Sequence, residues 1–150
     1  MSFDITEHDR QISNLIRIGI IEIVDHFNKR LRVRSGGVLT GWLPWPAEVG
    51  RNFIHWRPLR IGTQVILGSQ SGDLEQATII GMLYTQIFDS PSTDPALDLI
   101  EWNDGARISY NIDSGEMVIK AIGDLCIKAG GNIWIDSQTV HVFEGTPCQQ

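Results

Sequence analysis

The chain has 150 residues and carries 12 Lys and Arg against 18 Asp and Glu, a formal net charge of −6. This length suits one ordinary domain, or a small domain with an extension. The acidic balance argues against a duplex-binding protein, whose affinity rests on neutralising phosphates. Cys126 and Cys148 belong to no CxxC or Cys/His cluster, so neither a disulfide framework nor a zinc site is expected. The polar, acidic start and the lack of a long apolar run predict a protein without signal peptide or membrane span, made in the cytoplasm.

Residues 1–15 are predicted to form a short helical arm. Thr6 stands in an N-cap position with Asp9 three residues on, as in a capping box. Ile5, Ile12 and Ile16 recur near one face of such a helix. The arm either packs on its own chain or docks on a partner.

Residues 16–85 show the alternation of a β-domain. Leu31 and Val33 alternate with three arginines, which predicts an inward apolar face and an outward basic one. Residues 47–58 are expected to form an irregular loop and Ser71-Gly72-Asp73 a hairpin turn. Five short strands in about 70 residues favour a small barrel of the OB type, with a small sandwich as the alternative.

Residues 86–100, with prolines among Ser, Thr and Asp, are predicted to be a linker, and residues 146–150 a tail without pattern. Between them, residues 101–145 carry apolar pairs one position apart that recur every seven or eight residues. Residues two apart share one face of a strand, so each repeat is predicted to be a short strand with one apolar face. Such a segment is too small to bury a core alone and is expected to pack on copies of itself as an intertwined β-helix. The predicted contact residues are Ile108, Tyr110, Ile112, Met117, Ile119, Leu125, Ile127, Ile133, Ile135, Val140 and Val142.

The block Gly41-Trp42-Leu43-Pro44-Trp45 carries a family resemblance, together with Ile12 to Gly19, Ile61 to Val65, Ser71 to Leu74 and Gly81 to Tyr84. In this order and spacing the blocks resemble phage baseplate assembly protein V, the central spike of contractile phage tails, which is related to the spikes of R-type pyocins and type VI secretion. The resemblance implies an all-β homotrimer: a short N-terminal helix, an OB-fold barrel, and a triple-stranded β-helical needle. It further implies attachment to the tail hub protein, piercing of the host outer membrane on sheath contraction, and a place in the virion tail baseplate.

Members of this family often end in an apex where a His-x-His pair from each chain holds iron. His141 is here a weak metal candidate without a second histidine at that spacing, so no iron or other cofactor is expected. The needle is predicted to end near Phe143 as an apolar tip, which a separate small protein of the PAAR type would cap.

No enzyme is expected, because the chain contains no Gly-x-Ser-x-Gly or Walker-type motif and the linker is too short for the lysozyme domain that some spikes carry. The competing hypotheses are the spike of a tail-like bacteriocin or secretion system, an OB module that binds single-stranded nucleic acid through its tryptophans, and a small trimeric adhesin. The acidic balance speaks against nucleic acid as a partner.

Overall fold

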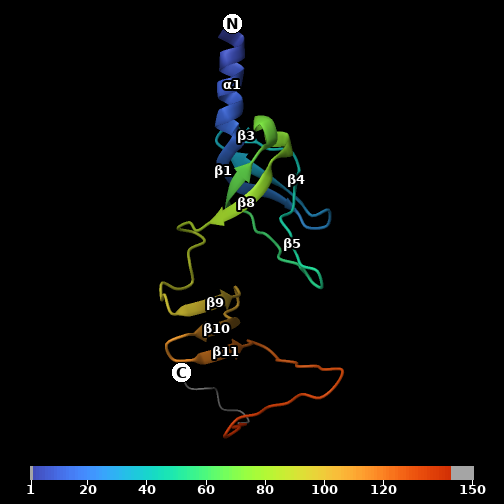
Figure 1. Cartoon of the computed structure of the whole chain (residues 1–150), viewed down its shortest axis with the longest axis vertical. Helices are drawn as coiled ribbons and strands as arrows, with labels where there is room; N and C mark the ends of the chain where they lie inside the picture. Colours follow the sequence, from blue (N-terminus) through green and yellow to red (C-terminus); the bar gives the residue numbers. More distant parts are fainter. Residues whose placement is uncertain (1, 143–150) are drawn as a thin grey trace. The chain divides into compact units, whose positions relative to one another are not determined.

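The computed structural model describes residues 2–142, with side chains from residue 5 onward. The chain divides into two compact units, Met1–Thr93 and Asp94–Gln150 (Figure 1). It is mostly β with one helix, as the sequence predicts for the fold class. No helix among residues 2–142 has the length and apolar character needed to cross a membrane.

The first unit begins with a helix that leads directly into a curled sheet. Its longest sheet has the order β3-β2-β1-β7-β8, and β4 pairs with the free part of β2. All neighbouring strands are antiparallel, and β4 also contacts β8, so the sheet bends back on itself in the manner of an OB-type domain. The elements are α1 (Ser2–Leu15), β1 (Ile16–Asp25), β2 (Arg30–Ser35), β3 (Val38–Leu39), β4 (Leu43–Pro44), β5 (Glu48–Val49), β6 (Ile54–His55), β7 (Gln64–Gly68), η1 (Gln70–Gly72), η2 (Leu74–Gln76) and β8 (Thr78–Leu83).

The core of this unit lies inside the curled sheet. On β2, Leu31 and Val33 are fully buried while Arg30 and Arg34 are exposed, so the predicted alternation is confirmed. Burying each such aliphatic side chain contributes about 1.5–3 kcal/mol by transfer from water. The buried core residues are Ile21, Leu31, Val33, Leu43, Leu59, Val65, Leu67 and Ala77.

Two local expectations for this unit are wrong. The connection between β7 and β8 is no simple hairpin turn but two consecutive 3₁₀ turns, η1 and η2, and Asp73 accepts a hydrogen bond from the Glu75 amide that begins η2. Residues 47–58 are not wholly irregular, since β5 and β6 pair there as a two-stranded hairpin. Both differences arise from short backbone pairings that leave no apolar period in the sequence.

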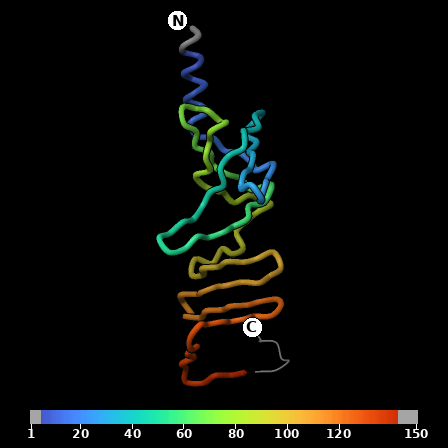
Figure 2. Tube along the Cα trace, turned by 90° about the vertical axis from the view of Figure 1, so that its right-hand side faces the viewer, coloured from blue at the N-terminus to red at the C-terminus, as the bar shows by residue number. Residues whose placement is uncertain are grey.

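The second unit contains a three-stranded antiparallel sheet of order β11-β10-β9. Its strands are β9 (Leu97–Glu101), β10 (Arg107–Asn111) and β11 (Glu116–Lys120), and they succeed one another as stacked passes of the chain (Figure 2). β9 begins inside the segment 86–100 that was expected to be a linker. Its alternating Leu97, Leu99 and Glu101 pair with β10, and the Pro-rich composition just before them hides this short pattern.

Residues 121–142 follow β11 without any strand pairing inside this chain (Figure 1). The sequence predicts short strands there, with apolar pairs such as Ile133 and Ile135. Those apolar side chains are exposed, and the structure assigns no strand to residues 121–142.

Candidate self-association surface

The three-stranded sheet of the second unit has one apolar face. Residues directly opposite each other in an antiparallel pair lie on the same side of the sheet. The register places Ile108 opposite both Ile100 and Ile119, and Tyr110 opposite Met117 and Asp98. One face therefore carries a continuous row of large apolar side chains across all three strands. This surface, called the needle face below, consists of Ile100, Ile108, Tyr110, Met117 and Ile119, with Asp98 beside Tyr110 on the same side.

The needle face is open to solvent in the single chain. Met117 and Ile119 are 65% and 56% exposed, and Ile100 and Ile108 are exposed as well. Contiguous apolar surface of this kind marks a contact with another molecule far more often than a solvated face. The single chain thus exposes an apolar sheet face that contact with another molecule would bury.

The opposite face of the same sheet differs in character. Arg107, Ser109 and Asn111 from β10 face this side with Glu116 from β11, around a shallow hollow of about 180 Å³ that Leu97, Leu99 and Val118 also line. The needle face is thus mostly apolar and exposed, whereas the opposite face combines polar side chains with half-buried apolar ones. A one-residue slip of register would exchange them, so the pairing is strongly specified.

The structure brings together only part of the predicted contact set. Four of its members, Ile108, Tyr110, Met117 and Ile119, lie on the needle face. Ile112, just after β10, is also exposed. Sequence reasoning missed Ile100, although the alternation of Asp98 and Ile100 in the assumed linker could have revealed it.

The remaining predicted contact residues lie in the segment without strands. All six are exposed, and the structure does not join them into one surface with the needle face. Their part in a contact between copies stays a prediction, and the predicted tip residue Phe143 lies outside the described residues. The six are Leu125, Ile127, Ile133, Ile135, Val140 and Val142.

Within residues 2–142, no three side chains of His, Cys, Asp or Glu come close enough together to hold a metal ion. His141 therefore belongs to no such group of three among the described residues. The expectation of no iron stays a prediction.

The Gly41–Trp45 block forms a corner of the barrel. Leu43 is fully buried and pairs with Leu31 across β4 and β2. Gly41 lies against the Glu75 carboxylate, where a Cβ would collide with the carboxylate oxygen. Trp42 is half exposed beneath the Arg32 guanidinium, 5.8 Å from the ring centre. Leu43 and Gly41 therefore pack this corner tightly, whereas Trp42 stays half exposed.

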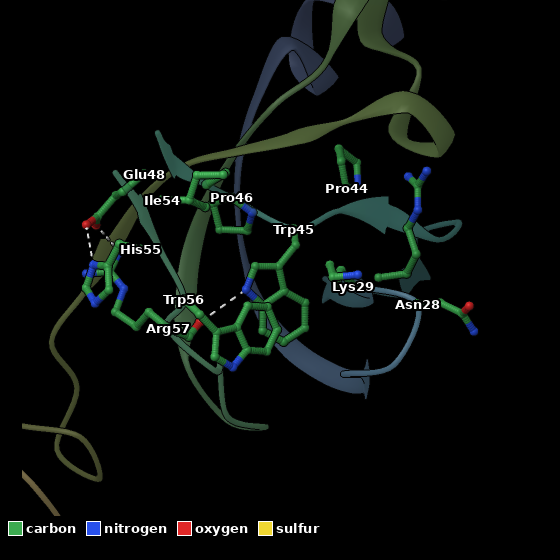
Figure 3. Close-up of a pocket in the computed structure, with 12 residues that line it drawn as sticks. Asn28, Lys29, Pro44, Trp45, Pro46, Glu48, Ile54, His55, Trp56 and Arg57 are labelled. Atoms are coloured by element: carbon green, nitrogen blue, oxygen red, sulfur yellow. Dashed lines mark hydrogen bonds and ion pairs between the residues drawn. The ribbon is translucent and has the colours of Figure 1, made fainter. Parts of the chain in front are cut away.

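Trp45 connects this corner to the hairpin β5–β6. Its ring stacks on Trp56 with centroids 5.3 Å apart, and its Nε1 donates a hydrogen bond of 3.2 Å to the Arg57 carbonyl (Figure 3). The two rings border a hollow of about 570 Å³ that is lined by apolar side chains such as Ile54 and by charged ones such as Lys29. Stacked aromatic pairs add about 0.5–1.5 kcal/mol beyond the area they bury.

A charged cluster joins the two strands of that hairpin. The Glu48 carboxylate on β5 accepts a hydrogen bond from His55 Nδ1 at 2.8 Å and lies 2.9 Å from the Arg57 guanidinium (Figure 3). The hydrogen bond from His55, and then the charge of Arg57, lower the pKa of the Glu48 carboxyl below its ordinary value. The cluster thus links β5 to the end of β6 and to Arg57 just beyond it.

Comparison with known proteins agrees with this geometry. The family described as the type VI secretion system/phage-baseplate injector OB domain matches residues 17–84, which cover β1 to β8. Over 144 residues the chain is 32% identical to the spike protein of Escherichia phage P2; this match covers 95% of the chain and 68% of that protein. It therefore extends through both units. The chain belongs to the phage baseplate V family of spike proteins and is a phage tail baseplate component built on an injector OB domain.

Proposed function

We propose that this protein is the structural central spike of a contractile phage tail, and that it works as a homotrimer. In the trimer, residues 101–145 of three chains form an intertwined triple-stranded β-helix. The OB-type barrels attach to the tail hub, and contraction of the sheath drives the needle through the host outer membrane. The proposed role is mechanical and involves no catalysis or cofactor, and assembly takes place in the host cytoplasm.

One observation carries the proposal: among the described residues of the second unit, most large apolar side chains are exposed to solvent. Ile119 on the needle face and Ile127, Ile133 and Ile135 beyond it are more than half exposed. A chain with this surface gains stability only when other molecules cover it. The relationship to a phage spike protein supports the proposal that other copies of this chain cover these side chains.

Residues 121–142 give the proposal its second support. Their backbone forms no strand within one chain, although apolar residues alternate there as in strands. Strands without neighbours are unstable because their N–H and C=O groups lack partners. In an intertwined trimer, these groups would pair with the adjacent chains, and the apolar side chains would meet on the common axis.

The decisive measurement is the molar mass in solution at low micromolar concentration, repeated after heating in detergent. We expect three times the 16.8 kDa of one chain before heating and a single chain afterwards. A folded species of 16.8 kDa in dilute buffer would contradict the proposal.

A pair of variants tests the needle face itself. Ile119→Asp places a charge on the apolar face and should abolish the trimer, because a buried unpaired carboxylate costs several kcal/mol. Lys120→Asp changes the neighbouring side chain, which points to the opposite side of β11, and should leave the trimer intact. If both variants remained trimeric, the needle face would not be the contact.

A further inference from the structure

The helix α1 has little support from its own chain. Among residues 5–15, only Gln11 and Asn14 are half-buried and the others are exposed, and the helix extends away from the barrel (Figure 1). A 14-residue helix is marginal in water without tertiary packing. The exposed side of residues 5–15 is therefore open to a contact with another molecule.

The base of the helix is firmly anchored. The Ser69 amide donates to the Leu15 carbonyl at 2.9 Å, and the Ser69 hydroxyl donates to the Asn14 carbonyl. Gly72 lies directly against the helix: a Cβ there would be 2.5 Å from the Gln11 carbonyl oxygen, and its φ of +72° favours glycine as well. The barrel thus holds α1 in a defined direction while leaving its outer side free.

The free side of α1 carries a seam with coiled-coil spacing. Ile5, His8, Ile12 and Leu15 follow one another at intervals of three, four and three residues, which corresponds to alternating a and d positions of a heptad. Ile5 and Ile12 are 64% and 66% exposed. The barrel contacts the helix at Gln11 and Asn14, and Ser71 of η1 borders the seam, but Ile5 and Ile12 stay exposed.

The seam also contains a hollow that can accept a side chain. His8, Gln11, Ile12 and Leu15 surround a shallow hollow of about 270 Å³, bordered by Ser71. These four residues stand at i, i+3, i+4 and i+7, the four-residue hole that accepts one knob from a facing helix in coiled coils. The hollow is thus shaped for an aligned helix.

The occupant that fits is the same helix from other copies of this chain. The needle proposed above tethers three identical chains in parallel, so three α1 helices are present at high effective concentration. In parallel helices the seams face each other in register. Ile12 of one helix then lies opposite the hole around Ile12 of the next, as knobs-into-holes packing requires. We infer that the α1 helices of three chains pack as a short parallel coiled coil along Ile5, His8, Ile12 and Leu15, a second self-association surface that rests on the proposed trimer.

His8 and the first strand refine this inference. A polar residue inside a coiled-coil seam lowers stability but specifies register, which gives His8 a role at its d position. The apolar surface also continues beyond the helix, because β1 follows directly and exposes Ile16, Ile18 and Ile20 on its outer side.

Thiol cross-linking on the full chain tests the inference. In a background with Cys126→Ser and Cys148→Ser, Ile12→Cys places a thiol in the seam, and Ser13→Cys places one on the exposed side of the same helix. With a short bis-maleimide reagent, we expect Ile12→Cys to join two chains of each trimer within minutes and leave the third single. Ser13→Cys should react at least tenfold more slowly, because a helix about 10–12 Å wide separates these positions.

Molar mass measured on the same samples separates this inference from the proposed function. A trimer in which Ile12→Cys does not cross-link, or cross-links no faster than Ser13→Cys, overturns the coiled coil and leaves the spike proposal standing. A monomer overturns both. Selective cross-linking of the trimer at residue 12 supports the coiled coil. It is supported further if the added substitution Ile5→Asp leaves the protein trimeric but abolishes this cross-link.

Discussion

Single residues in this protein are constrained by how closely neighbouring strands pack as much as by hydrophobicity. Gly19 on β1 is the clearest case. A Cβ at this position would collide with the Val33 side chain and lie 2.8 Å from the Arg34 carbonyl oxygen. The neighbouring strand β2 therefore approaches β1 across a site where only glycine fits without movement. Its role is packing, and no feature of the local sequence reveals it.

At this scale we predict that Gly19→Ala destabilises the barrel by about 1–3 kcal/mol, the usual cost of overpacking a core. Gly37→Ala is the matched control, since a Cβ at residue 37 meets nothing within 4 Å and the turn keeps its shape. Urea unfolding followed by tryptophan fluorescence compares the two midpoints. Equal midpoints for both variants would show that β2 gives way at no cost.

Among the elements, the hairpin β5–β6 depends on side chains rather than on its backbone. Each strand has two residues, and its outward side chains Val49 and Ile54 are exposed. The Trp45–Trp56 stack connects it to the Gly41–Trp45 corner, and the Glu48 cluster holds its two strands together. The stability of the hairpin should therefore depend on whether the Glu48 carboxylate is charged.

This dependence predicts a pH effect. Because hydrogen bonding to His55 and the charge of Arg57 lower the pKa of Glu48 in the folded state below its ordinary 4.5, the cluster stabilises the hairpin fully above that pH. The stabilisation is lost as the pH falls through the folded-state pKa. Tryptophan emission of the wild type should therefore change below pH 4.5 more than that of Glu48→Gln, which lacks the titrating group. Superimposable titrations of the two proteins would contradict this role.

For the whole molecule, the two units bury their apolar residues in different ways. The first encloses a core of its own, with Ile21, Leu31 and Leu67 fully buried. The second exposes its apolar residues and, in the proposed trimer, would bury them only between chains. Unfolding one needle segment would then require separating all three chains, which favours slow unfolding and resistance to detergent without heat.

At this scale Ile127→Asp should convert the trimer to monomers while the barrel stays folded, because a carboxylate would replace an apolar group between the chains. Lys128→Asp introduces the same charge at the next position, on the other side if the segment alternates as a strand. Light scattering reports the mass, and far-UV circular dichroism reports the barrel. A trimeric Ile127→Asp protein would place residue 127 away from the axis.

The sequence alone was enough for features that depend on neighbours in the chain. The alternation of Leu31 and Val33 with arginines identified the inner face of β2, and the apolar pairs around Met117 and Ile119 identified one face of a sheet, because a strand has a side-chain period of two. The Gly41–Trp45 block indicated the family before any fold was known.

The tertiary structure decided what depends on residues far apart in the chain. On β1, isoleucines occur on both faces, so the sequence could not tell that Ile21 is buried while Ile18 and Ile20 are exposed. The stack of Trp45 on Trp56 and the contact of Gly72 with α1 likewise join segments with no shared pattern. The physical reason is that the burial of a side chain depends on which segments pack against it. The periodicity of the sequence shows only which residues lie on the same face of a strand or helix.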